Sequence, residues 1–149
     1  MIVGPDEFLT NLVPLVDHKN SRDVPTIFVS LNDIYSGRYF AEQGRDDAEK
    51  IKYFIKNALD EWGIDNVMLV GGSAFIPTRD THIKVSNSDM EIFVSDLYYA
   101  DIYNKTDDFS SWDTNNNNIF AEYNWDGEND VMDLYPDAVS YTHLTLPTN

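Results

Sequence analysis

The sequence contains no cysteine and few basic residues. Without cysteine, these 149 residues cannot form a disulfide, a thiolate metal site or a cysteine nucleophile. Ten lysines and arginines stand against 26 aspartates and glutamates, which gives a formal net charge of −16 at pH 7. A chain this acidic has no basic patch with which to neutralise phosphates. We therefore expect no nucleic-acid partner and no affinity for anionic membrane surfaces.

Long apolar runs are also lacking. No stretch approaches the roughly 20 residues needed to cross a bilayer, so no membrane span is expected. Residues 1–4 have neither the basic nor the apolar region of a signal peptide and read as a strand already under way, which predicts a native start further upstream. The chain is 42% hydrophobic and 13% aromatic, which is typical of a globular protein with a real core.

The last residues differ from the rest in composition. Residues 89–137 hold thirteen acids and a single base, Lys105, whereas residues 139–148 hold no acid. The segment V-S-Y-T-H-L-T-L-P-T also back-translates without a mismatch into a transposon-end adapter of a sequencing library. We therefore interpret residues 1–137 as native and residues 138–149 as a non-native tail that makes few contacts. The alternative is a genuine C-terminal strand, which alternating Tyr, Leu and Thr would suit.

The first half of the chain alternates strand and helix patterns. Apolar or β-branched runs predict three strands, over residues 1–4, 26–31 and 66–70. Apolar residues at helical spacing predict two helices, over residues 6–17 and 46–62. Asp6 caps the first, which Pro14 interrupts or restarts, and Asp46 and Gly63 bound the second. Apolar strands between helices indicate an α/β fold with a mainly parallel sheet flanked by helices.

The second half is polar and irregular. Residues 79–91 predict a loop or hairpin, and residues 91–94 and 97–103 are candidate strands. Residues 104–133 are rich in aspartate and asparagine and are too polar for a core. We predict a long loop there, and loops of this length are usually functional or ordered by a metal.

One spacing in this loop is typical of calcium sites. Oxygen donors recur at Asp113, Asn115, Asn117, the Ile119 carbonyl and Glu122. Calcium takes six to eight oxygens from such alternation, although an EF-hand has glycine where Asn118 stands and a later glutamate. Asn tolerates the left-handed turn, and Asp126 or Asp130 could add oxygens. We predict a structural calcium site; the alternative is a solvated loop.

Other candidate sites are weaker. Gly71-Gly72-Ser73 follows a predicted strand but matches neither a phosphate-binding loop nor a nucleophile elbow. His18, His82 and His143 are far apart in the sequence and form no metal or catalytic set.

Taken in order, several segments resemble a gingipain-like cysteine peptidase of family C25. They are P-D-E-F at 5–8, L-V-D-H-K at 15–19, V-P-T at 24–26, D-I-Y at 33–35, A-E-K-I at 48–51, V-M-L-V-G-G at 67–72, I-P-T-R at 76–79 and S-D-L-Y-Y-A-D at 95–101. W-D-x-N-x-N-x-I at 112–119 and Y-P-D at 135–137 are similar to the stretch before the family's V-G-R-[LI] strand. The resemblance covers residues 1–137.

This resemblance implies a caspase-like α/β sheet, here incomplete, and thiol endopeptidase ancestry with protein or peptide substrates. In the family, the catalytic histidine of a Gly-His pair and the nucleophilic cysteine both come later than residue 137, so we assign no catalytic residue here. The resemblance also implies export to the cell surface or beyond, where calcium is abundant. Three alternatives stay open: a non-catalytic, calcium-stabilised binding module of an exported surface protein, a flavodoxin-like domain, and salt adaptation as the reason for the acidity.

Overall fold

A computed structural model describes residues 1–86 and 89–142, and these residues form two compact units. We call residues 1–77 together with strand β8 (Val139–Thr142) the first unit, and residues 78–138 the second unit. In the first unit the elements run β1 (Ile2–Gly4), η1 (Asp6–Phe8), α1 (Leu9–Asn20), β2 (Phe28–Ser30), α2 (Leu31–Tyr35), α3 (Asp47–Trp62) and β3 (Asn66–Leu69).

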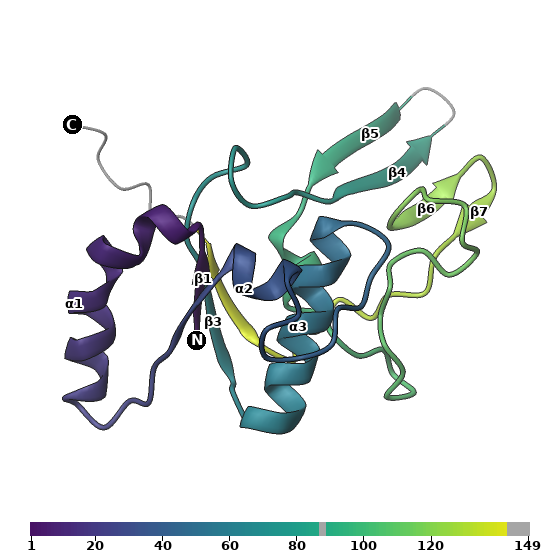
Figure 1. The fold of residues 1–149 in the computed structure, drawn as a ribbon. Coiled ribbons are helices and arrows are strands. Elements are labelled where there is room, and N and C mark those ends of the chain that lie inside the picture. The colour runs from purple at the N-terminus through teal and green to yellow at the C-terminus, as the bar shows by residue number, and fades with distance from the viewer. Residues whose placement is uncertain (87–88, 143–149) are drawn as a thin grey trace. The chain divides into compact units, whose positions relative to one another are not determined.

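The first unit is built on a parallel sheet, as the sequence predicts. Its strand order is β2-β1-β3-β8, and every neighbouring pair is parallel. Figure 1 shows β1 and β3 side by side. Ile2 lies opposite Phe28 on one side and Met68 on the other. The strands of residues 26–31 and 66–70 therefore run in the same direction, because both are parallel to β1. The α/β prediction is confirmed.

Alternation along the strands divides the apolar side chains between the two faces of this sheet. On one face, Ile2 and Val70 form a buried cluster with Leu12 of α1, and Phe28 and Met68 pack against it. The residues that alternate with these, among them Val3, Val29 and Leu69, are also buried. Helix α3 contributes its own buried side chains, including Ile51, Ile55 and Ala58.

Local signals fix the ends of α3. The Asp46 side chain accepts a hydrogen bond from the Glu49 N–H at 2.9 Å, which satisfies one of the free donors of the first turn. The Glu49 carboxylate bonds instead to the backbone N–H and guanidinium of Arg45. Gly63 ends the helix in the left-handed conformation, with φ of 64°.

The first helix differs from its predicted form. Asp6 lies in the short 3₁₀ helix η1, and α1 begins only after Phe8, which offers no side-chain cap. The helix then continues through Pro14 to Asn20. Proline removes the hydrogen bond to the carbonyl of Thr10, but both residues are exposed, so water can reach that carbonyl. Helix α2 was not predicted; the capping box between Ser30 and Asp33 starts it directly after β2.

The expectation that residues 138–149 make few contacts is wrong for Val139–Thr142. These residues form β8 and pair in parallel with β3, from Asn66 opposite Val139 to Leu69 opposite Thr142. The physical reason is that β3 presents a free edge, whose backbone groups can pair with any extended segment of suitable β propensity. Whether the tail is native stays a prediction, and residues 143–149 lie outside the described residues.

The second unit holds a mixed sheet of order β5-β4-β6-β7. Its strands are β4 (Asp80–Ser86), β5 (Asp89–Val94), β6 (Glu122–Trp125) and β7 (Glu128–Asn129), with the 3₁₀ helix η2 (Asp96–Tyr99) after β5. The hairpin β4–β5 agrees with the prediction for residues 79–91 and with the strand at 91–94. The predicted strand at 97–103 is wrong, because η2 occupies its first half and only Tyr103 bridges to Phe109.

The sequence suggested that residues 104–133 are too polar to contribute to a core, and this expectation is wrong. Trp112 and Phe120 are buried from this segment, and Trp112 packs edge-on against Tyr98. Arg79 is also buried, with its guanidinium 3.8 Å from the Phe120 ring centroid and 4.7 Å from that of Tyr98. A few large aromatic residues thus supply a core around which a polar chain folds.

Candidate functional site

The carboxyl edge of the parallel sheet is where α/β proteins usually place ligands. In the first unit β1 ends at Gly4 and β2 ends at Ser30. Ser30 is buried, and its hydroxyl oxygen accepts the Asp33 N–H at 3.1 Å. This serine is therefore engaged in starting α2 and is not presented as a nucleophile.

The histidines form no catalytic set within the part of the chain that the structure describes. His18 lies exposed in the last turn of α1. His82 of β4 has its Nδ1 2.9 Å from the Phe120 carbonyl, and its ring packs edge-on against Trp125 at 5.1 Å. His143 lies outside the described residues.

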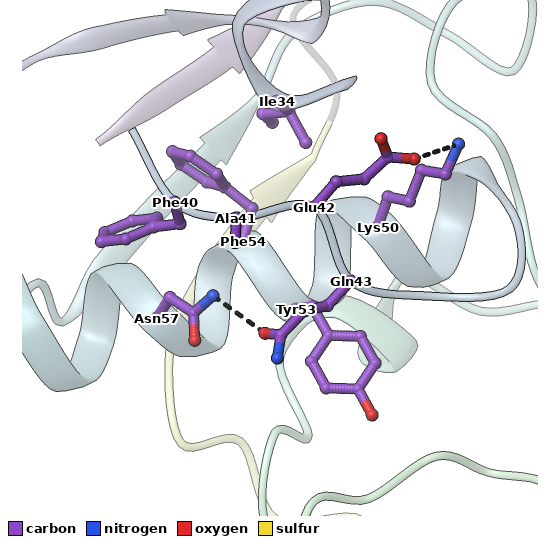
Figure 2. A pocket seen from close by; sticks show the side chains of 9 residues that line it. All are labelled: Ile34, Phe40, Ala41, Glu42, Gln43, Lys50, Tyr53, Phe54 and Asn57. Atoms are coloured by element: carbon purple, nitrogen blue, oxygen red, sulfur yellow. Dashed lines mark hydrogen bonds and ion pairs between the residues drawn. The ribbon is translucent and has the colours of Figure 1, made fainter. Parts of the chain in front are cut away.

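A small pocket lies between α3 and residues 40–43 (Figure 2). Lys50 and Glu42 form an ion pair of 2.8 Å at one end, and the Asn57 amide donates to Gln43 Oε1 at 3.2 Å (Figure 2). The volume is about 10 Å³, roughly the space of one water molecule. This pocket is therefore a gap in packing and too small for a ligand.

A larger hollow of about 910 Å³ opens at the amino ends of β1 and β3. Apolar side chains such as Leu15, Ile27 and Trp62 line it, with Lys19 and Asp65 among the charged residues. It lies at the opposite edge from the one where α/β sheets bind their ligands.

The acidic loop that begins at Asp113 brings carboxylates and side-chain amides together. Asp113 and Glu122 are each only 1% exposed. The Asp113 carboxylate accepts the N–H of Asn117 at 3.0 Å and that of Asn118 at 3.2 Å. Asn118 adopts φ of 65°, so it takes the left-handed turn that the calcium prediction required of it.

The two remaining asparagines converge on Glu122. The side-chain amides of Asn115 and Asn117 both donate to Glu122 Oε2, at 3.0 and 2.9 Å. The Asn115 Oδ1 atom accepts the Asn117 N–H, and the Asn117 Oδ1 atom accepts the Ile119 N–H at 2.7 Å. Four of the five predicted ligands are thus joined directly by hydrogen bonds through their side chains. Ile119 joins them through its backbone N–H, whereas the predicted ligand atom is its carbonyl oxygen.

Asp130 completes this cluster, and Asp126 does not. The Asp130 carboxylate accepts the Thr114 N–H at 2.6 Å and the Glu122 N–H at 3.0 Å. Burial raises the pKa of the Asp130 carboxyl above its usual value; the two N–H donors lower it, and the charges of Glu122 and Asp113 raise it again. Asp126 lies exposed in the turn between β6 and β7.

The side chains of this loop are not arranged as a metal centre in this structure. Within residues 1–86 and 89–142, no three Asp, Glu or His side chains are arranged so as to hold a metal ion. The asparagine amides turn their nitrogens, not their oxygens, toward Glu122. The residues nevertheless fit a calcium site in kind, because all of them carry hard oxygen donors and two of the carboxylates are buried.

Sequence reasoning missed two aspartates that organise the second unit. Asp101 is fully buried, and its carboxylate accepts hydrogen bonds from the Ser110 hydroxyl at 3.0 Å and from the Trp112 indole N–H. The Asp137 carboxylate accepts the N–H groups of Ile102 and Tyr103, both at 2.8 Å. The one available signal was the position of Asp101 inside an otherwise apolar run.

The model of peptidase family C25 matches residues 1–138 of this chain. The chain belongs to peptidase family C25. No curated protein and no solved structure gave a match. The C25 assignment confirms the resemblance drawn from the sequence, and it agrees with the parallel sheet of the first unit. Among the described residues of this C25 chain, no helix is long and apolar enough to cross a membrane.

Proposed function

We propose that this chain is part of the peptidase domain of a cysteine endopeptidase that cleaves proteins or peptides. One observation supports this above the others: the peptidase family matches residues 1–138, yet the chain has no cysteine. The thiol nucleophile and its histidine base would then come from native sequence beyond residue 138. Thiol proteolysis needs both groups, since the thiolate attacks and the histidine moves the proton.

The role of the present residues is to build the scaffold. The parallel strands β1, β2 and β3 supply one edge of a sheet, outside whose carboxyl ends α/β enzymes place reacting groups. Ser30, which lies at this edge, is already engaged in the cap of α2. The chain alone is therefore expected to be inactive.

Activity assays with a thiol reagent test this proposal. The purified chain should cleave no member of a peptide library, with or without iodoacetamide. The full-length parent should cleave, and replacing its downstream cysteine by alanine should abolish the cleavage. Iodoacetamide-sensitive cleavage by the chain alone would contradict the proposal. A parent without a later cysteine and Gly-His pair would instead favour a non-catalytic binding module of a surface protein.

We further propose that the acidic loop binds a structural calcium ion outside the cell or at its surface. Asp113, Glu122, the amides of Asn115 and Asn117 and the Ile119 carbonyl would hold it, and Asp130 would fix the backbone beside them. Support comes from the burial of both carboxylates and from their mutual contacts through the asparagines. Without a cation, the crowded negative charges oppose a compact loop. Rotating both amides would turn their oxygens toward Glu122.

Thermal unfolding with calcium, magnesium or chelator tests the calcium site. A ligand present at about 100 times its Kd stabilises the folded state by about 2.7 kcal/mol, so calcium should raise Tm by several degrees. The substitution Glu122→Gln should remove that rise, whereas Glu128→Gln, at an exposed glutamate of β7, should retain it. A Tm that ignores both calcium and chelator would contradict the proposal.

A further inference from the structure

Strand β5 is the outer strand of the sheet in the second unit. It pairs with β4 on one side, and the sheet order ends there. All six of its residues are exposed. An outer strand presents a row of backbone donors and acceptors that another extended chain can use.

The hydrogen bonds next to β5 indicate which backbone groups face outward. The Ser95 N–H donates to the Arg79 carbonyl at 3.2 Å, so the backbone of Ser95 faces β4. Backbone groups of alternate residues in an antiparallel pair point to opposite sides of the strand. The N–H and carbonyl groups of Ile92 and Val94 therefore point away from β4, toward an incoming strand.

The side chains of β5 add an apolar strip beside these groups. Met90, Ile92 and Val94 share one face of the strand, and they are 46%, 58% and 57% exposed. Apolar side chains that alternate along an open edge are what strand-addition sites use to select a ligand. A cluster of this kind on one hairpin exceeds the scatter of single exposed apolar residues that every surface has.

Charge decides what kind of strand would fit. Residues 78–138 contain fourteen acids and three bases, and β5 itself carries Asp89 and Glu91. A second copy of the chain, paired through its own β5, would bring like charges together across the new ladder, which is destabilising. Lysine or arginine on the incoming strand would instead meet opposite charges.

We propose that β5 accepts an extended, lysine- or arginine-bearing segment of a partner protein as an additional strand of this sheet. The backbone of Ile92 and Val94 supplies the hydrogen bonds, and the apolar strip receives every second side chain. Asp89 and Glu91 on β5 favour the cationic partner. This site stands apart from the proposed peptidase function, since no residue of it is assigned to proteolysis.

A synthetic peptide of about ten residues, a common strand length, in which valine and lysine alternate is a suitable probe. Labelled peptide is titrated with the full chain, and fluorescence anisotropy gives the Kd. Two further peptides separate the contributions: one carries N-methyl groups on the backbone N–H groups of one edge, and one has glutamate for lysine. Loss of one or two net hydrogen bonds should weaken binding about tenfold, and the glutamate peptide should bind more weakly still.

Substitutions on β5 locate the site. Ile92→Pro removes an outward N–H at a sheet edge, where proline is tolerated, and should weaken binding of the lysine peptide about tenfold. Ile92→Val keeps that N–H and should bind like the parent chain. Circular dichroism and Tm confirm that both variants are folded. The proposal would be overturned if the lysine peptide did not bind, or if the N-methylated peptide bound equally well. It would also be overturned if sedimentation showed concentration-dependent dimers of the chain that Ile92→Pro abolishes.

Discussion

The two units solve the same folding problem in different ways. The first unit satisfies its backbone through helices and parallel strands and fills its core mainly with aliphatic side chains. The second is built on a mixed sheet, and its chain turns sharply at many points. Among the described residues, nine that are not glycine have positive φ, and all but Asp23 lie in the second unit. Trp112, Ala121 and Leu134 are among them, although such residues rarely adopt this conformation.

In the irregular segments of the second unit, side chains serve as partners for backbone groups that no strand ladder satisfies. Asp137 accepts two backbone N–H groups, Asp130 accepts two, and Asp113 accepts two. Asn104 likewise accepts the N–H groups of Thr106 and Asp108. The acids of this polar segment are thus a large part of what holds irregular backbone in place. The aspartates of the second unit therefore hold its backbone in place as well as supplying its negative charge.

The largest effect is expected from removing the aromatic core of the second unit, which tests whether this unit depends on that core while the first unit does not. Trp112→Ala deletes a side chain that is 1% exposed and also its hydrogen bond to Asp101. Truncating a buried aromatic costs about 3–5 kcal/mol, so the second unit should unfold. Hydrogen exchange followed by mass spectrometry should show loss of protection over residues 98–125, with α3 unchanged. Equal loss in α3 would show that the units unfold together. Trp112→Phe should have the smaller effect.

The matching test in the first unit is Ile55→Ala in α3. Ile55 is fully buried, and a truncation of this kind costs about 2–5 kcal/mol, depending on how far the site collapses. Loss of protection should now appear in α3 and β1, not in the second unit. Ile55→Val, expected to cost about 0.5–1.5 kcal/mol, gives the graded control in urea unfolding. If Ile55→Ala were no worse than Ile55→Val, aliphatic packing would not be what stabilises this unit.

A smaller effect is expected at the end of α3. A Cβ added at Gly63 would meet nothing within 4 Å, so the cost of Gly63→Ala comes from its positive φ alone. A left-handed residue with a Cβ costs about 1–2 kcal/mol. Gly63→Asn should cost less, because asparagine tolerates this conformation. Urea midpoints of the three proteins should fall in the order Gly, Asn, Ala; an alanine variant as stable as the parent would refute the argument.

The smallest effect concerns alkaline pH in the first unit. Burial raises the pKa of Tyr35 from 10.0 to about 12, with Asp47 raising it too and Lys50 lowering it. The folded state therefore keeps the phenol proton more firmly than the unfolded state does. The stability that this supplies is complete below pH 10 and is lost as pH rises through about 12. Tyr35→Phe should flatten that part of the Tm profile; an unchanged slope would contradict the assignment.

Prediction from sequence succeeded where local signals and burial agree. Helix α3 has a cap at Asp46, a stop at Gly63 and apolar residues at helical spacing, so its ends were found within one residue. It failed where distant residues decide. The run at 97–103 has the composition of a strand, but the Ser95 hydroxyl accepts the Leu97 N–H, and Asp137 takes the N–H groups of Ile102 and Tyr103. A local sequence pattern cannot predict a hydrogen-bond partner such as Asp137, which lies some 35 residues away.

In the candidate site, too, local spacing predicted some features, and the tertiary fold decides the others. Spacing was enough to select Asp113, Asn115, Asn117 and Glu122, and the structure brings these side chains into one hydrogen-bonded group. Spacing gave no sign that Asp113 and Glu122 are buried, or that Asp130, rather than Asp126, lies with them. Burial depends on Trp112 and Phe120, whose packing is set by the tertiary fold.

The position of β8 beside β3 has a consequence for how the chain is organised. Two adjacent parallel strands must be joined by a crossover, for which a dozen residues and one helix suffice. Here the whole of the second unit occupies that crossover, because β3 precedes it and β8 follows it. The cost of closing a loop rises only with the logarithm of its length. Any native strand that follows residue 138 and pairs at this edge of β3 would make the second unit an insertion within one connection, free to lengthen, shrink or diversify while the parallel sheet keeps its strand order.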